Sequence, residues 1–194
     1  MKNFIKIVLI ALQVLVLVAC TRGGGSSSGR AAPASDFTYD LTSDGKGVVI
    51  REYTGNGGAL VIPAEIEGYP VMELNARAIY GEDSRSYGPG YNITSVVIPA
   101  SVKKIGTGCF VRIENLKSVT IHGIGVEVHD AAFKDCLNLE TLNIPNGDNT
   151  LIPGAPSIYI RGRGYDGGDD AFQGCKKLPL AMRSRLVGMG FTEP

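Results

Sequence analysis

The chain holds two histidines, His122 and His129, which are the first residues to consider for acid–base chemistry or zinc binding. Neither lies in a motif that spells a catalytic triad, a zinc site or a general-base pair, and no G-x-S-x-G, phosphate loop or H-E-x-x-H occurs. Both lie in a repeated pattern that places them at turns, which favours exposed or turn-bonded histidines. The sequence therefore predicts no catalytic residue, no metal site and no cofactor.

Carboxylates gather in one unusual segment, 161–170, where Asp166, Asp169 and Asp170 stand among glycines. Such hard oxygen ligands can bind Ca²⁺, but the spacing matches neither an EF-hand nor a repeated Gly-Asp nonapeptide. A solvated loop is the favoured interpretation, and a contact site for a partner is the alternative. An enzyme would need a pocket joining one of the histidines to these aspartates, so catalysis is the least favoured class of function.

The balance of charge argues against two classes of partner. The 194 residues contain 19 Lys and Arg and 19 Asp and Glu, with no basic stripe of the kind that binds nucleic acid. No polybasic segment for anionic lipid is present either. We therefore expect no nucleic-acid partner, and contact with a membrane must come from another feature.

That feature is the N-terminus. Residues 1–19 combine the charged Lys2 and Lys6 with an apolar run that is too short for a transmembrane helix, as in a signal peptide. The run ends Leu17-Val18-Ala19-Cys20, which resembles the lipobox of bacterial lipoproteins. The resemblance implies that Cys20 is lipidated and becomes the first residue of the exported chain. The alternative is an ordinary signal peptide followed by a coincidental cysteine.

Residues 20–35 follow as a Gly/Ser-rich stretch that cannot bury apolar surface, and they are expected to form a flexible tether. About fifteen such residues give a root-mean-square reach of roughly 20 Å from the membrane. Thr21, after the lipidated cysteine, is not the Asp that favours inner-membrane retention in enteric bacteria. The sequence therefore predicts an exported protein, anchored by lipid in the bacterial envelope at the outer membrane or the cell surface.

Beyond the tether the chain repeats itself every 23 residues. The segments 93–99, 116–122 and 139–145 align without gaps, and Asn92, Asn115 and Asn138 precede them. In each predicted strand alternate apolar residues face one side, namely Val96 and Ile98, Val119 and Ile121, Leu142 and Ile144. One strand cannot bury that side alone, so successive repeats must stack and build a continuous core. The pairs Cys109-Phe110, Ala132-Phe133 and Ala171-Phe172 would plug it.

The repeat I-T-S-V-V-I-P-A-S-V-K-K-I-G-T-G-C-F at 93–110 resembles the BspA-like, treponemal-type leucine-rich repeat, and the resemblance extends over roughly 37–191. It implies a repeat solenoid: a short right-handed leucine-rich-repeat coil with parallel β-strands, an N-terminal β-hairpin cap and a C-terminal capping helix. The hairpin is expected to turn at 55–58, and short helical or irregular returns are expected at the Ala-Phe pairs. The chain departs from the family at Ile79, at His122 and His129, and in insertions at 81–91 and 146–170.

The pattern divides the chain into successive parts. After the signal peptide (1–19) and the tether (20–35) come the cap and first repeat (36–91) and the repeats (92–178), which carry an insertion at about 152–170. The C-terminal cap is 179–194. Within it, a helix is expected over 179–187, because Pro179 suits a first helical turn and Gly188 ends the segment. This helix would cover the last coil with Leu180, Met182, Leu186 and Val187.

Three cysteines lie inside the repeats. Cys136 and Cys175 occupy the same repeat position, so in an exported protein a disulfide between them is conceivable. The favoured alternative is that they pack as two small buried hydrophobes, and Cys109 likewise belongs to the core.

The strand residues that point away from the core form two predicted rows and are the candidate partner-binding residues: Ser95, Val97, Ser118, Thr120, Thr141 and Asn143. These rows are small, polar and nearly uncharged, which suits a protein or a glycan, such as host matrix or the surface of another bacterium. Members of the family are often adhesins, so the resemblance implies a non-catalytic binding module. The alternative is a structural or assembly scaffold that faces the periplasm.

Overall fold

A computed structural model of the chain describes residues 29–80, 89–146, 150–154 and 171–191. The signal peptide, Cys20 and most of the tether lie outside these ranges. So do the carboxylate segment 161–170 with its calcium alternative, and most of the two insertions. Among the described residues no helix is both long and apolar enough to cross a membrane.

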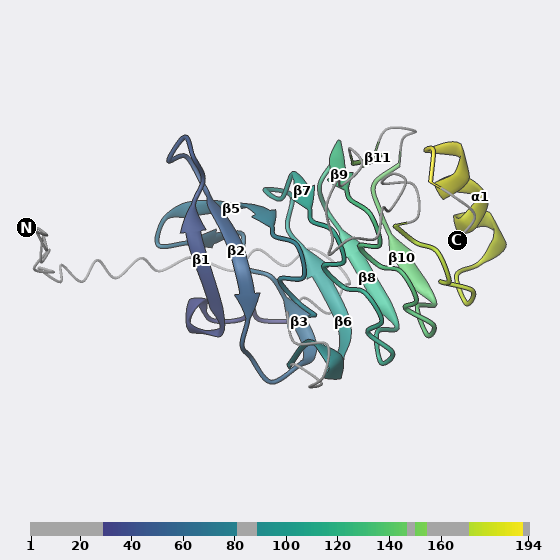
Figure 1. The fold of residues 1–194 in the computed structure, drawn as a ribbon, viewed down its shortest axis with the longest axis horizontal. Coiled ribbons are helices and arrows are strands. Elements are labelled where there is room, and N and C mark those ends of the chain that lie inside the picture. The colour runs from purple at the N-terminus through teal and green to yellow at the C-terminus, as the bar shows by residue number, and fades with distance from the viewer. Residues whose placement is uncertain (1–28, 81–88, 147–149, 155–170, 192–194) are drawn as a thin grey trace, which may run out of the picture.

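The chain winds into a solenoid with two sheets facing each other (Figure 1). The seven-stranded sheet has the order β1 (Phe37–Leu41), β2 (Val48–Tyr53), β5 (Tyr69–Leu74), β7 (Lys104–Ile105), β9 (Val126–Val128) and β11 (Leu151–Pro153), and β4 (Glu65–Ile66) also pairs with β5. The four-stranded sheet has the order β10 (Thr141–Asn143), β8 (Ser118–Ile121), β6 (Ile93–Ile98) and β3 (Gly58–Val61). Each coil gives one parallel strand to each sheet, so the predicted solenoid is confirmed.

The core lies between the sheets and consists of stacked repeat positions. Val96 pairs with Val119 and Val119 with Leu142 across the four-stranded sheet, and all three side chains are buried. The Ala-Phe segments are turns rather than helices, and they insert Phe110, Phe133 and Phe172 as a column. Its ring centroids are 4.9 and 5.1 Å apart, with interplanar angles of 3° and 8°. The three phenylalanines expected to plug the core are therefore all buried in it.

The repeated asparagines hold successive coils together at one corner. Asn115 Nδ2 donates to the backbone oxygen of Tyr91 at 3.2 Å, and Asn138 Nδ2 donates to that of Glu114 at 2.8 Å. Each amide thus gives a carbonyl of the preceding coil a hydrogen bond.

The N-terminal cap is a β-hairpin, but its turn is not at 55–58 as predicted. β1 pairs antiparallel with β2 and the chain reverses between Thr42 and Gly47, whereas 54–57 carries the chain from the seven-stranded sheet to the four-stranded one. The reason is that β2 lies between β1 and β5, so it has no free edge for β3. β3 instead pairs parallel with β6, and this places Leu60 in the core. The positive φ angles of Gly57 and Gly58 serve this crossing.

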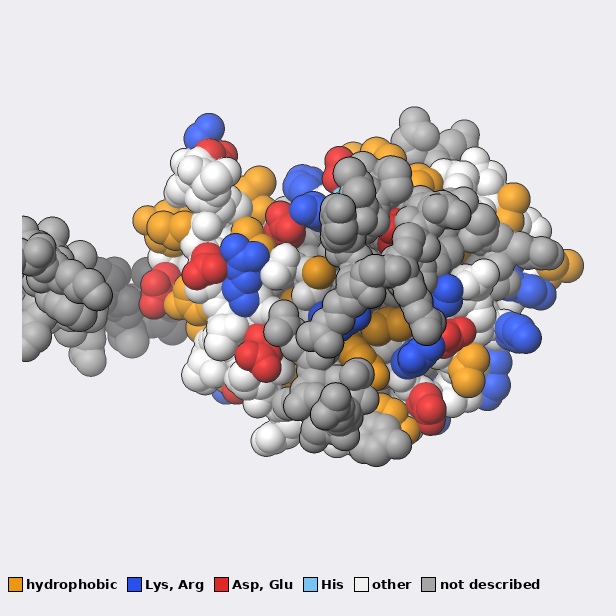
Figure 2. Space-filling view, in the orientation of Figure 1, with side chains coloured by type: hydrophobic (Ala, Val, Ile, Leu, Met, Phe, Trp, Pro, Cys, Tyr) orange, Lys and Arg blue, Asp and Glu red, His pale blue; other side chains and the backbone are white. Residues whose placement is uncertain are grey.

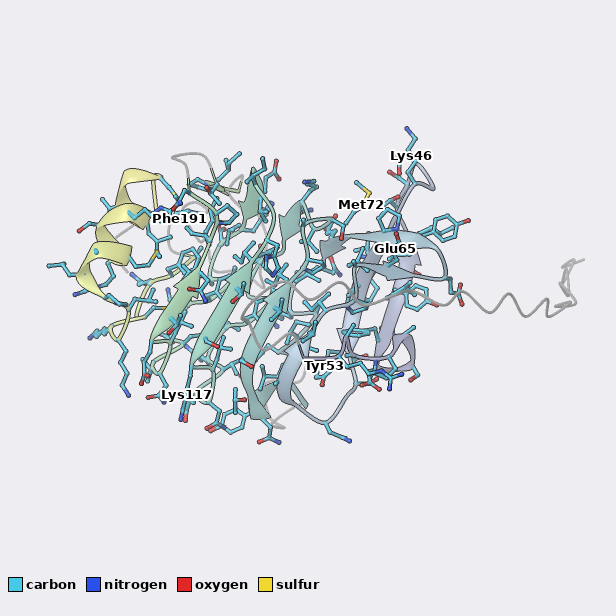
Figure 3. The ribbon with its side chains drawn as sticks, turned by 180° about the vertical axis from the view of Figure 1, so that it is seen from behind. Lys46, Tyr53, Glu65, Met72, Lys117 and Phe191 are labelled. Carbon is cyan, nitrogen blue, oxygen red and sulfur yellow. The ribbon has the colours of Figure 1, made fainter. Side chains whose placement is uncertain are left out.

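The C-terminal helix α1 (Leu180–Gly188) covers the open end of the last coil, with a short 3₁₀ helix at each of 34–36 and 89–92 elsewhere. Of the four apolar residues expected to face the core, Leu186 is buried and Met182 partly so, but Leu180 and Val187 are 72% and 50% exposed. Phe191, which the sequence pattern does not single out, closes the column edge-on against Phe172 at 5.2 Å (Figure 3). The helix begins at Leu180, and with Leu186 turned to the core, the side of the helix that carries Leu180 and Val187 faces outward.

A testable consequence concerns the turn before each plug, where Gly108 and Ala131 occupy the same repeat position with φ of 61° and 54°. An L-residue with a φ angle in this left-handed region destabilises the fold by about 1–2 kcal/mol. Glycine avoids that strain, but its larger conformational freedom in the unfolded chain lowers stability by about 0.5–1 kcal/mol. Ala131→Gly is therefore expected to raise the free energy of unfolding by roughly 0.5–1 kcal/mol in urea titrations of the chain from Thr21 onward.

The neighbouring Ala132→Gly is the matched control, because Ala132 is fully buried and its φ is not positive. It is expected to lower stability by about 1 kcal/mol. If both substitutions destabilise the chain equally, the strain assigned to Ala131 is wrong.

Candidate binding face

The outward positions of the four-stranded sheet form two straight rows. Ser95 is in register with Ser118, and Ser118 with Thr141, across β6, β8 and β10. The second row runs parallel to the first and consists of Val97, Thr120 and Asn143. The six predicted residues therefore share one face, and the alternation that placed them outside is confirmed. On β3 the rows continue with Ala59 and Val61.

The side chains of this face are available to solvent and only lightly engaged with one another. Asn143 Nδ2 donates to Thr120 Oγ1 at 3.3 Å, which ties two strands within one row. Thr141 and Asn143 are exposed and the other four residues are half-buried by their neighbours. Neighbouring strands are about 4.8 Å apart, so the rows present hydroxyl and amide groups at a regular interval. Charges enter only at the border, where Lys117 and Glu140 precede the strands (Figure 3 labels Lys117).

A cavity of about 490 Å³ lies beside the face, at the free edge of β3. Its walls include Arg30, Asp36, Tyr53 and Ala59. The backbone N–H of Ala32 donates to the carbonyl of Val61 at 2.9 Å, so the end of the tether runs along part of this edge. Sequence reasoning missed the cavity, because it depends on the crossing of 54–57 and no motif marks it.

The comparisons with known proteins bear on these repeats. Residues 84–155 match the family described as "BspA type Leucine rich repeat region (6 copies)". Over these residues the match confirms the resemblance drawn from the 23-residue pattern. No curated protein sequence matches the chain.

Several solved structures of leucine-rich repeat proteins are similar to this chain. A leucine-rich repeat protein from Bacteroides ovatus aligns with a TM-score of 0.51 and 20% identity, over 72% of this chain and 32% of that one. The T. pallidum leucine-rich repeat protein TpLRR aligns at 0.41 and 20%, over 84% and 97%. A leucine rich cell surface protein from Faecalibacterium prausnitzii aligns at 0.40 and 23%, over 64% and 44%. The likeness to the Bacteroides ovatus protein, at 20% identity, concerns the fold alone.

The two histidines of the repeats lie where the period placed them, at turns. His122 is exposed, and its backbone N–H donates to Ile98. His129 is largely covered, with Nε2 3.5 Å from Glu127 Oε2, and its ring lies so close to Gly154 that a β-carbon there would come within 2.5 Å of it. In the described part of the chain no three His, Cys, Asp or Glu side chains are grouped so that they could hold a metal ion.

The three cysteines of the repeats are free, buried thiols, so the disulfide considered for Cys136 and Cys175 is not formed. Cys136 Sγ donates to the carbonyl of Phe110 at 3.0 Å, and Cys175 Sγ donates to that of Phe133 at 3.2 Å. Each thiol therefore binds the backbone of the preceding plug. Burial raises the pKa of Cys175 to about 12 and holds the pKa of Cys109 and of Cys136 well above the ordinary thiol range.

These thiols are expected to be inert in the folded chain, because the thiolate is the reactive form and burial disfavours it. With the chain from Thr21 onward, a thiol reagent at pH 8 should label none of the three within minutes and all three after unfolding in urea without reductant. Ser118→Cys is the control and should react at once. Two thiols missing after unfolding would instead indicate a Cys136–Cys175 disulfide.

Proposed function

We propose that this chain is a non-catalytic binding module that recognises a protein or a glycan through the exposed face of its four-stranded sheet. The observation that carries the proposal is the pair of straight, uncharged rows formed by Ser95, Val97, Ser118, Thr120, Thr141 and Asn143. Solenoids typically bind partners on such extended faces, since stacking holds every row in place.

The chemistry of the rows favours a neutral partner surface. Hydroxyl and amide groups donate and accept hydrogen bonds, and the methyl groups of Val97 and Thr120 add apolar contact. The rows themselves carry no charge, and Lys117 and Glu140 at their border have opposite signs. A charged polymer would therefore find no complementary charge on this face. Peptide groups and sugar hydroxyls are the complementary chemistry.

A double substitution tests this face. Ser118→Lys with Thr120→Lys adds two long charged side chains to the centre of the rows. It is expected to weaken binding by roughly tenfold or more, which corresponds to about 1.4 kcal/mol. The purified chain from Thr21 onward would be measured against immobilised extracellular-matrix proteins, a glycan array and fixed cells of other bacteria.

Glu127→Lys is the matched control, because it changes the net charge by the same amount on the outer side of the seven-stranded sheet, where Glu127 is exposed. It is expected to leave binding within about twofold. An equal loss in both variants would show that charge, not the face, determines binding, and no binding to any of the three probes would contradict the adhesive role.

The proposal includes a location: the chain is exported, anchored by a lipid on Cys20, and displayed on the cell surface as an adhesin. Its support is the lipobox-like Leu17-Val18-Ala19-Cys20 and the Gly/Ser stretch after it. Protease applied to intact cells should degrade the chain, and Cys20→Ser should release it from the membrane fraction. Protection from protease in cells whose periplasmic marker is also protected would favour the scaffold that faces the periplasm.

A further inference from the structure

The described residues at the two ends of the solenoid differ in the sign of their net charge. Residues 29–80, at the N-terminal end, contain seven acidic and four basic side chains, whereas 171–191, at the C-terminal end, contain four basic and none acidic. The described repeats between them, 89–146 and 150–154, are balanced with five of each. Figure 2 shows the basic side chains gathered at the end where α1 lies.

The C-terminal end also exposes apolar surface. Leu180 and Val187 are seven residues apart on α1, so both lie on one side of the helix, and they are 72% and 50% exposed. Ser184 is exposed between them. Leu186 and Phe191 face the core, so folding of a single copy does not use the side that carries Leu180 and Val187. We refer to Leu180, Ser184 and Val187 as the tail stripe.

The N-terminal end has an apolar patch of its own. Leu41 on β1 is 53% exposed and Tyr69 on β5 is 40% exposed. Leu41 pairs with Val48 and Val48 with Val71, two residues from Tyr69, so the two side chains lie on the same side of the sheet. Tyr39 is also on this side, and desolvation together with the neighbouring Glu67 carboxylate raises its pKa. We refer to Tyr39, Leu41 and Tyr69 as the head patch.

Acidic residues border the head patch. Glu67 lies in the turn between β4 and β5, and Glu65 lies on β4 at the same end of the solenoid, although its pairing with Pro70 places it on the other side of the sheet from Tyr69. β1 is moreover an edge strand of the seven-stranded sheet, and within the described residues no α-helix covers the head as α1 covers the other end (Figure 1).

We propose that copies of this chain associate head to tail, with the tail stripe of one copy seated on the head patch of the next. Apolar residues then meet apolar residues, and the basic end meets Glu65 and Glu67. Because head and tail are different surfaces, the contact is heterologous and each copy keeps one free end, so the product is a linear array along the solenoid axis.

Charge selects a second copy over a lipid surface as the occupant of the head patch. The cytoplasmic and many bacterial membrane surfaces are anionic and attract Lys and Arg, whereas Glu65 and Glu67 would be repelled. The basic tail of another copy is the complementary surface that the described residues offer.

Cross-linking of the full chain in bacterial cells tests the contact. One chain carries Leu41→Cys and a second, with a different epitope tag inserted after Thr21, carries Val187→Cys; the native repeat thiols are buried and do not compete. A short bismaleimide should link the two chains at least about tenfold more often than it links Val187→Cys to a Ser118→Cys control. Links between two Val187→Cys chains, or between two Leu41→Cys chains, should stay at the control level.

A charge exchange gives the second measurement. Glu65→Lys with Glu67→Lys, added to the Leu41→Cys chain, should lower the cross-link about tenfold, since like charges then face each other. Lys176→Glu with Ser184→Glu, added to the Val187→Cys chain, should restore it. Restoration also shows that the altered chains are folded.

Three results would overturn the proposal. The first is a head-to-tail link no more frequent than the Ser118→Cys control. The second is a symmetric link, tail to tail or head to head, above that level. The third is a cross-link that does not change when the charges at the head are reversed.

Discussion

Each coil of this solenoid must return the chain to a point one strand spacing beside its start, and this 23-residue step is the constraint on which the other features depend. The phenylalanine column makes it visible. Its centroid separations of 4.9 and 5.1 Å are close to the spacing of about 4.8 Å between neighbouring strands. Aromatic pairs left to themselves prefer offset or edge-to-face arrangements. The nearly parallel rings are therefore set by the backbone repeat, which places identical residues directly beside one another.

The stacking of equivalent positions is kept even where an insertion lengthens one coil. Phe172 comes 39 residues after Phe133 instead of 23, and it still stacks on it at an interplanar angle of 8°. Cys175 likewise repeats the bond that Cys136 makes to the backbone of the preceding coil. An insertion placed between the strand and the plug thus lengthens the path of the chain without moving the positions that stack.

Stacking determines the core, and by the same register it determines the outer rows. A residue beside a buried strand position is carried outward at the identical height in every coil, so a polar row forms wherever the outward residues are polar. The histidines and thiols, which carry reactive chemistry in other proteins, serve turns and packing in the described part of this chain. The ends are different, because a repeat has no neighbour there. Phe191 closes one end edge-on, and the β1–β2 hairpin extends only one of the two sheets at the other.

The sequence by itself determined the period, the inward and outward alternation, the plugs and the two outer rows, because each of these is stated three or more times along the chain and each copy supports the others. Only the tertiary structure decided the parts that occur once. The turn at 55–58 has the glycines of a hairpin, yet the occupied edges of β2 made it a crossing between sheets. α1 was expected from Pro179 and Gly188, but its contact with the last coil turned Leu180 and Val187 outward and brought in Phe191. The cavity beside β3 follows from that crossing. Long-range strand pairing selects among the conformations that a local sequence allows. A single segment of sequence does not show which strand edges are free to pair with it.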